Sequence, residues 1–458
     1  MILAPESRQP ALRRLSAVPW WGWILALVLA EALAIVIFLP TSWSQAVGNG
    51  DGAEYQRYAF NLLHHGVFSE SPVPPYHAGV VRSPGYPSVL AALQWVGGRH
   101  VLVVQFAQFA LLGATSILVG LIGRAVARPA VGNVAAVLSA TYVPFLGLAT
   151  VFLTETLATF LLTAVVLLLL RARRTGSVWT YATIGVVLSA ATYVRPESAL
   201  LAIPIVLVLL LNRRSRLSLT TRWTMAATLA AALVVPLVPW LIRDVSATGG
   251  RLIPMEADGG VALLASVDQY DGTMSESFAD VKVWDAQVAR LLSVPAAARV
   301  GIQAPVEYAT ARRQAGIDDQ ERSAATRLFK SLSLSTIVTH IPGRVIGLWP
   351  VGDETPPPNA GTIWHRVAQL QYVLLVILGL IGIAVRRRRL VHDWPLWLVA
   401  ADLTLTHLVF PVEARYTIPA RPMLTIYSAV GALAAVELVR RRSTRRMPWA
   451  GARADARG

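Results

Sequence analysis

Two carboxylic acids lie directly beside long apolar runs of this sequence. Asp51 follows the first run, together with Glu54 and Tyr55, and Glu155 lies at most one turn inside another run, in VFLTETLATFLL. An unpaired charge at the centre of a membrane-spanning helix costs about 2.5–3.5 kcal/mol on insertion scales, so ionisable groups in a bilayer usually mark a site. The alternative for Asp51 is that it is solvated or caps a helix, as carboxylates at helix ends commonly do.

Basic and aromatic side chains recur at the same ends of the apolar runs. Arginine can bind phosphate through two parallel hydrogen bonds, and a carboxylate can accept a proton from a hydroxyl group. Fixed cations also stabilise the charge that develops on a departing phosphate, which suits a reaction between a phosphate-linked lipid and a nucleophilic acceptor. Each arginine could instead extend to lipid headgroups. These further candidates are Arg82, Arg195, Glu197, Arg243, Arg415 and Tyr416.

The composition indicates a polytopic membrane protein. The 458 residues are 55% hydrophobic and 15% charged, whereas about a quarter of the residues in soluble domains are charged. The net charge of +15 comes from arginines in short clusters between apolar runs, and no basic patch with interleaved aromatic residues indicates nucleic-acid binding. The chain has no cysteine, which excludes disulfides and thiolate metal sites.

Apolar length and arginine placement predict the topology. A spanning helix needs about 20 apolar residues, and every even-numbered connection between the runs is rich in arginine. By the positive-inside rule, both termini are cytoplasmic and the acids face the other side. Ten runs meet or approach the required length: 20–40, 101–123, 129–148, 152–170, 178–194, 197–211, 223–242, 367–385, 394–412 and 417–438.

One further apolar segment, PSVLAALQWV at 87–96, is too short to cross and is predicted to be re-entrant or interfacial. Long loops translocate regardless of their charge, so two long external regions are compatible with this topology. The expected organisation is a cytoplasmic N-terminus at 1–19, a transmembrane catalytic module at 20–242 with an external loop at 41–100, an external loop with amphipathic helices at 243–366, C-terminal transmembrane helices at 367–438, and a basic cytoplasmic tail at 439–458.

The order of these polar groups resembles a known family. Asp51-x-x-x-Tyr55, Gly66-x-Phe68 and Arg82-x-Pro84-x-Tyr86-Pro87 are similar to the first external loop of bacterial glycosyltransferases related to protein O-mannosyltransferases and lipid A aminoarabinose transferases. Further similarities follow along the chain in Thr154-Glu155, Arg195-Pro196-Glu197, Pro239-Trp240-Leu241-Ile242-Arg243 and Ala414-Arg415-Tyr416.

The ten or so spans predicted from the apolar runs are fewer than relatives often have. The resemblance implies an all-α membrane protein with the C-type glycosyltransferase superfold. It implies that Asp51 is the catalytic base, that Glu155 is a second acid in the same cavity, and that Arg82 contacts the phosphate of a polyprenyl-phosphate sugar, the co-substrate. Arg243 and Arg415 complete the predicted phosphate-binding set. A divalent cation held by Asp51 and Glu155 is left open. The predicted cavity-lining residues are Glu54, Tyr55, Tyr86, Arg195, Glu197 and Tyr416.

The chain departs from the family at Gly52, where relatives often have a second acid directly after the aspartate; here Glu54 follows two positions later. The leading hypothesis is an inverting transfer of a sugar to a lipid, glycan or protein hydroxyl at the extracytoplasmic face of the cytoplasmic membrane. A transporter or flippase of lipid-linked saccharides is the alternative, although no repeated halves are evident. A non-catalytic scaffold for envelope assembly would tolerate substitution of the external acids.

Overall fold

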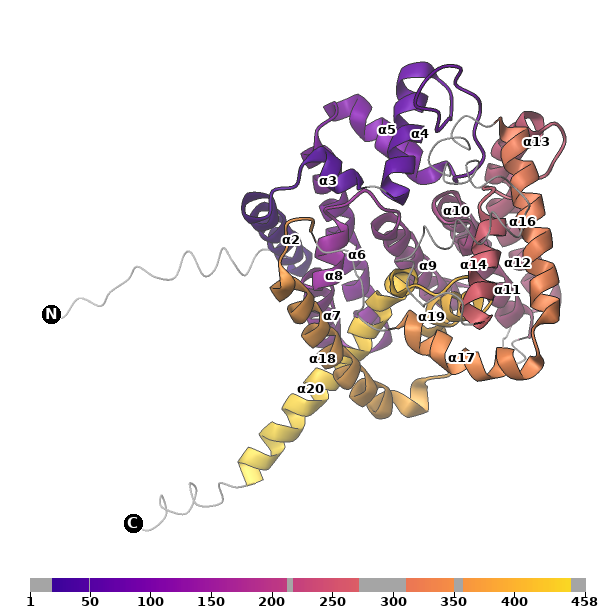
Figure 1. Ribbon diagram of the computed structural model, residues 1–458. Coiled ribbons are helices and arrows are strands. Elements are labelled where there is room, and N and C mark those ends of the chain that lie inside the picture. Colours follow the sequence, from indigo (N-terminus) through magenta and orange to yellow (C-terminus); the bar gives the residue numbers. More distant parts are fainter. Residues whose placement is uncertain (1–18, 49, 212–216, 272–309, 350–356, 446–458) are drawn as a thin grey trace, which may run out of the picture.

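The chain folds mainly into helices (Figure 1), and the computed structural model describes residues 19–48, 50–211, 217–271, 310–349 and 357–445. No strand occurs within these ranges. Six helical segments are long and apolar enough to cross a membrane: Trp20–Phe38, Val101–Val126, Glu155–Thr175, Leu219–Thr248, Thr362–Arg389 and Ala414–Arg441. Three shorter apolar segments are Pro129–Ala140, Val178–Val194 and Pro196–Leu211.

The bundle consists of the helices of these nine segments together with the helices Val143–Leu148 and Trp394–Thr406. The first half of the chain contributes α2 (Trp20–Phe38), α6 (Val101–Val126), α7 (Pro129–Ala140), α8 (Val143–Leu148), α9 (Glu155–Thr175), α10 (Val178–Val194), the 3₁₀ helix η1 (Pro196–Leu201) and α11 (Ala202–Leu211). The second half contributes α12 (Leu219–Val234), η2 (Val235–Leu237), α13 (Val238–Thr248), α18 (Thr362–Arg386), η5 (Arg387–Arg389), α19 (Trp394–Thr406), η6 (Ala414–Ala420) and α20 (Arg421–Arg445).

The expected all-α, multi-pass class is therefore correct, while the count of ten spans is not confirmed. The run predicted at 129–148 divides into α7 and α8, because the helix ends at Ala140 and restarts with Pro144 in the first turn of α8. Proline lacks the backbone N–H needed to continue the hydrogen-bond ladder, but it is tolerated in the first turn of a helix. The run predicted at 223–242 continues through α13 to Thr248, six residues into the region expected to be an external loop.

The interior of the bundle forms where α9 packs against both α6 and α10. Val119 of α6, Val165 of α9, and Ile184 and Leu188 of α10 are completely buried. The outer faces instead keep large apolar side chains exposed, as Ile377 of α18 does. Contiguous exposed apolar surface is rare on soluble monomers and typical of proteins in contact with lipid.

Helices α18 and α20 approach each other closely through small residues. A Cβ atom on Gly382 would lie 1.9 Å from the carbonyl oxygen of Tyr427, and one on Gly431 would lie 2.0 Å from that of Leu378. Glycine at such contacts allows the backbones of membrane helices to pack tightly. This packing holds the C-terminal helix α20 against the bundle and so fixes the position of the residues just before it.

Short helices gather at one end of the bundle, where α4 and α5 lie side by side at the top of Figure 1. They are α3 (Trp43–Val47), α4 (Asp51–His65) and α5 (Gly85–Gly97). The 13 residues of α5 extend only about 20 Å, too short to cross a bilayer, as expected for an interfacial helix. The long loop of the second half contributes α14 (Gly259–Asp271), α16 (Ala311–Ser331) and α17 (Leu334–Leu348).

Candidate active site

A polar cluster lies where four helix ends converge. Asp51 is the first residue of α4, and Glu155 is the first residue of α9. Arg195 caps the C-terminus of α10, and Arg415 belongs to η6, just before α20. The helix dipole favours carboxylates at N-termini and cations at C-termini, so it stabilises Asp51, Glu155 and Arg195 where they stand. Arg415, at the beginning of η6, depends instead on the acids around it.

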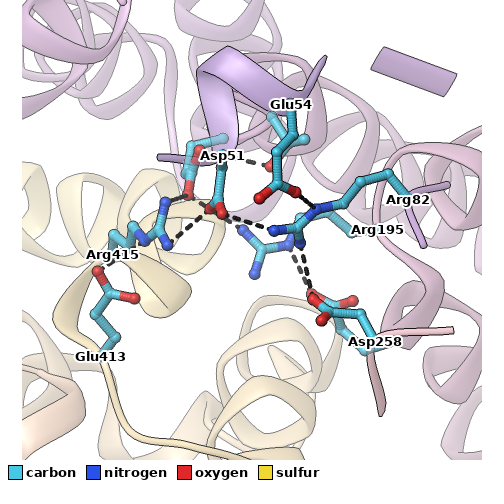
Figure 2. Close-up of polar contacts among 10 residues, drawn as sticks. Asp51, Glu54, Arg82, Arg195, Asp258, Glu413 and Arg415 are labelled. Atoms are coloured by element: carbon cyan, nitrogen blue, oxygen red, sulfur yellow. Dashed lines mark hydrogen bonds and ion pairs between the residues drawn. The ribbon is translucent and has the colours of Figure 1, made fainter. Parts of the chain in front are cut away.

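Asp51 lies between two arginines (Figure 2). Its Oδ1 accepts a hydrogen bond of 3.0 Å from Arg82, and its Oδ2 forms an ion pair of 2.9 Å with Arg415. Burial alone would raise the pKa of Asp51, but the guanidinium groups of Arg415 and Arg82 together hold it well below its usual range. Asp51 is therefore ionised in this arrangement.

Arg82 contacts three carboxylates at once. Besides Asp51, its Nε donates to Glu54 at 2.5 Å and its Nη1 to Asp258 at 2.8 Å. Glu54 follows Asp51 by three residues on α4, a spacing that places both on one face of a helix. Asp258 comes from the long loop of the second half, directly before α14, so Arg82 joins the two external regions predicted from the sequence.

Glu155 is nearly inaccessible, with 2% of its side chain exposed, and lies near two arginines. Its Oε1 is 3.5 Å from Nη1 of Arg195 and 3.8 Å from Nη1 of Arg415. Arg415 therefore contacts both Asp51 and Glu155, which brings the two predicted acids together around one guanidinium group. Arg195 also donates through Nε to Glu197 at 2.6 Å.

The three predicted tyrosines border this cluster. The guanidinium group of Arg82 lies 5.8 Å from the ring of Tyr55, and that of Arg415 lies 5.5 Å from the ring of Tyr416. The ring of Tyr86 meets that of Tyr55 edge to face at 5.4 Å, while its hydroxyl group donates to Gln108 at 3.0 Å. Cations near aromatic rings gain electrostatic stabilisation, so the rings of Tyr55 and Tyr416 help to hold the arginines.

Arg243 makes its contacts elsewhere. Its Nη1 donates to the carbonyl oxygen of Gly79 at 2.6 Å and to Asp244 at 2.7 Å, and its Nη2 donates to the carbonyl oxygen of Phe68 at 3.2 Å. It also lies over the ring of Trp240, 4.8 Å from the centroid. These contacts fasten the segment after α4 to α13, and none of them joins Arg243 to the acids that surround Arg82.

The geometry explains why Gly52 takes the place of a second acid. A Cβ atom at this position would lie 2.3 Å from the carbonyl oxygen of Val47 and 3.0 Å from that of Phe152. The contacting atoms belong to the backbone and cannot move aside as a flexible side chain can. No side chain fits here without a shift of α4, and Glu54 brings the second carboxylate of this helix to Arg82 instead.

Three further acids contact this region, and two of them, Glu256 and Asp258, were not predicted from the sequence. Glu413 pairs with Nε of Arg415 at 2.8 Å, Asp258 pairs with Arg82, and Glu256 accepts a hydrogen bond of 3.3 Å from the backbone of Ser83. The stretch EADGG, in which two acids precede a pair of glycines, was the available sequence signal for Glu256 and Asp258.

Two of these acids retain protons unusually well. Burial, reinforced by the charge of Asp258, raises the pKa of Glu256 to about 8. Burial also raises the pKa of Asp258 to about 6, against the opposing effect of Arg82. Both groups therefore titrate near neutral pH, where a change in the charge of the site can accompany binding.

The arrangement around Asp51 and Glu155 does not favour a divalent cation. Both oxygens of Asp51 contact arginines, and Glu155 lies near two guanidinium groups, so a cation would have to displace them. Hard cations prefer a shell of oxygen ligands. In the described part of the chain, no three of the His, Asp and Glu side chains form a metal-binding group.

Part of the sequence matches a known family. Residues 81–240 match the family described as dolichyl-phosphate-mannose-protein mannosyltransferase, which covers 160 of the 458 residues. No curated protein matches the sequence significantly. The matched region includes Arg82, Glu155 and Arg195 and ends before Arg415.

Solved structures show the fold. The oligosaccharyltransferase AglB from Archaeoglobus fulgidus, in complex with an inhibitory peptide and a dolichol-phosphate, is 15% identical with a TM-score of 0.53, covering 93% of this chain and 52% of that chain. The same archaeal enzyme in complex with zinc and sulfate is 14% identical with a TM-score of 0.52, covering 92% of this chain and 50% of that chain. ArnT from Cupriavidus metallidurans, bound to undecaprenyl phosphate, is 13% identical with a TM-score of 0.42, and the match covers 93% of this chain and 81% of that chain.

The chain spans about half the length of the archaeal oligosaccharyltransferase. The likeness shows that the bundle has the C-type glycosyltransferase superfold, so the predicted fold is confirmed.

Proposed function

We propose that this protein is a glycosyltransferase that moves a sugar from a polyprenyl-phosphate donor to a hydroxyl group of a lipid, glycan or protein. The position of Asp51 between Arg82 and Arg415 carries the proposal, because it joins a proton acceptor to two phosphate-binding groups. The family match over residues 81–240 supports it. The fold shared with an archaeal enzyme solved with dolichol-phosphate supports the class of donor.

In the proposed reaction, Arg82 and Arg415 bind the phosphate of the donor. The acceptor oxygen attacks the anomeric carbon from the side opposite the phosphate, and the bond from that carbon to the phosphate oxygen breaks. Asp51 takes the proton of the acceptor hydroxyl, and polyprenyl phosphate leaves with the bonding electrons. A single displacement of this kind inverts the anomeric carbon. The two guanidinium groups stabilise the charge that develops on the departing phosphate.

The low pKa of Asp51 gives donor binding a second role. A carboxylate held between two cations is a weak base, because accepting a proton means losing both ion pairs. The phosphate of the donor offsets the charge of Arg82 and Arg415, so its binding raises the pKa of Asp51 and makes it a better proton acceptor. The base is then active only when the donor is present.

Asp258 provides a way for the phosphate to reach Arg82. Six carboxyl groups surround the three arginines of the cluster, so some must release an arginine before an anion binds. In this proposal Asp258 is the first carboxyl group to release its arginine, since its pKa of about 6 makes protonation accessible near neutral pH. In its neutral form it no longer competes with phosphate for Nη1 of Arg82.

We place this site on the extracytoplasmic face of the cytoplasmic membrane, with both termini in the cytoplasm. The opposite end of the bundle carries the arginine-rich connections, where Arg386 pairs with Asp393 and Arg128 pairs with Glu437. Such an excess of arginine is typical of cytoplasmic ends. No step of the proposed mechanism runs through a metal ion, because the acids are engaged with arginines.

The direct test is an assay of purified protein in detergent with a radiolabelled polyprenyl-phosphate sugar and membrane lipids, glycans or peptides as acceptors. Transfer of label, with release of polyprenyl phosphate, is the expected result. Movement of the intact donor across a proteoliposome membrane without cleavage would identify a flippase instead. If donors of several sugar types neither bind nor react, the glycosyltransferase proposal is wrong.

A further inference from the structure

A large cavity lies at the end of the bundle opposite the polar cluster. Its volume is about 770 Å³, within the usual range for ligand pockets. It opens where the turn between α6 and α7 meets the C-terminal end of α18 and the middle of α20. Its lining includes Arg128, Val385, Arg387, Arg388, Arg389 and Leu433.

The cavity combines an apolar wall with a cationic edge. Val385 of α18, which is 58% exposed, and Leu433 of α20 contribute apolar surface, and the four consecutive arginines from Arg386 to Arg389 line one side. Glu437 is the one acid of the lining, and it pairs with Arg128. The site therefore offers apolar contact and positive charge to the same ligand.

Three of the arginines have charge available for a ligand. Arg386 is neutralised by Asp393, which accepts from its Nε at 2.7 Å and from its Nη2 at 2.8 Å. Arg387, Arg388 and Arg389 are exposed. Among the residues that the structure describes, no carboxylate lies within ion-pair distance of these three.

The position of the cavity along α20 places it near a membrane surface. Glu437 follows Arg421, the first residue of α20, by 16 positions, which corresponds to about 24 Å along the helix. The hydrocarbon core of a bilayer is about 30 Å thick, so the cavity and the polar cluster lie near opposite surfaces. A ligand here meets the headgroup region on the arginine-rich side.

We infer that this cavity binds an anionic phospholipid, with its headgroup phosphate at Arg387, Arg388 and Arg389 and part of an acyl chain against Val385 and Leu433. A phosphate alone would leave the apolar wall unused, and a neutral lipid would leave the three guanidinium groups without a counter-ion. Basic pockets between membrane helices are known to suit anionic headgroups. The inference is independent of the proposed sugar transfer, because it concerns the other end of the molecule.

The positive-inside rule explains why arginines are abundant at this end of the bundle, but it does not explain why the three of η5 line a cavity. Arg173 and Arg174 lie at the same end of the bundle and donate to the backbone carbonyls of His392 and Ala125. Neither of them lines the cavity. They contribute to the same charge bias but are engaged with the protein, whereas the arginines of η5 line a space large enough for a ligand.

The experiment compares two triple variants in the full-length, detergent-purified protein. The first replaces the cavity arginines (Arg387→Gln, Arg388→Gln and Arg389→Gln). The control removes the same charge from α9 (Arg171→Gln, Arg173→Gln and Arg174→Gln). Thermal unfolding is followed as short-chain phosphatidylglycerol, short-chain phosphatidylcholine or inorganic phosphate is added, and the half-saturating concentration is the measured quantity.

We expect phosphatidylglycerol to raise the unfolding temperature of the wild type and of the α9 variant saturably, with an affinity about 10- to 100-fold lower in the cavity variant. Phosphatidylcholine should have no saturable effect. Equal stabilisation by inorganic phosphate would overturn the lipid assignment, because the apolar wall would then contribute nothing. An unchanged affinity in the cavity variant would overturn the site. If the cavity variant does not fold, Leu433→Glu supplies the test, since a charge on the apolar wall must weaken binding.

Discussion

Asp51, near the start of the chain, and Arg415, near its end, form an ion pair of 2.9 Å. Arg415 also lies 3.8 Å from the carboxylate of Glu155, so one guanidinium group connects the beginnings of α4 and α9 with the segment before α20. Because the packing of α18 against α20 fixes that segment, the charge environment of Asp51 depends on the C-terminal helices as well as on its own loop.

Replacing Asp51 should abolish most of the transfer activity. General-base catalysis typically contributes about 10²–10⁴-fold, and Asp51→Asn removes the proton acceptor while keeping the size of the side chain. Donor binding should be at least as tight as in the wild type, because both arginines remain and the carboxylate that competes with phosphate for them is gone. The measurement is the initial rate at saturating donor, with Asp319→Asn, an exposed acid on α16, as the control. Retained turnover would disprove the assignment of the base.

Arg415 and Arg243 should behave differently when replaced by glutamine. Loss of a charge-assisted hydrogen bond to phosphate costs about 1.5–3 kcal/mol, so Arg415→Gln should weaken donor binding by roughly 10- to 150-fold. Arg243 donates to the carbonyl oxygens of Gly79 and Phe68, so Arg243→Gln should lower the unfolding temperature more than the donor affinity. An equal loss of donor affinity in both variants would show that Arg243 binds phosphate, as the sequence predicts.

Glu155→Gln should reduce transfer by about 10-fold or more while the protein remains folded, because glutamine keeps the shape but not the charge that faces Arg195 and Arg415. Rates and unfolding curves of the purified variant give the answer. Activity of the wild type that is lost on adding a chelator, combined with insensitivity of this variant, would favour a cation bound between Asp51 and Glu155. Unchanged turnover would remove Glu155 from the site.

The stability of the protein should fall as the pH rises through the titration of Glu256. The folded carboxyl group keeps its proton up to about pH 8, whereas an exposed one loses it near 4.5. Between these values the folded state binds more protons than the unfolded state, so an increase in pH favours unfolding. Glu256→Gln should flatten this decline, measured as the apparent unfolding temperature from pH 5 to 9. A variant as pH-sensitive as the wild type would show that another group is responsible.

Single cysteines can test the orientation directly, since the natural chain has none. Val73 and Val391 are exposed at opposite ends of the bundle, with 48% and 80% of their surface accessible. A membrane-impermeant maleimide should label Val73→Cys in intact cells and Val391→Cys only after permeabilisation. The reverse pattern would invert the topology and move the polar cluster to the cytoplasmic side.

The sequence alone determines the membrane class and most of the helices. The predicted run 178–194 coincides with α10, and the expected interfacial segment 87–96 lies within α5. Both follow from local properties, because the length of an apolar run decides whether it can cross a bilayer. The candidate acids Asp51 and Glu155 are also recognisable locally, since a charge beside an apolar run is unfavourable unless something compensates for it.

Only the tertiary structure decided which groups compensate for those charges. Asp258 reaches Arg82 from a distant loop, and Arg243 contacts Gly79 rather than the acids. Gly52 is required by two backbone carbonyls, one of them from the segment before α9. Partners of this kind depend on how segments far apart in sequence are brought together, and no local pattern of hydropathy or charge encodes that placement.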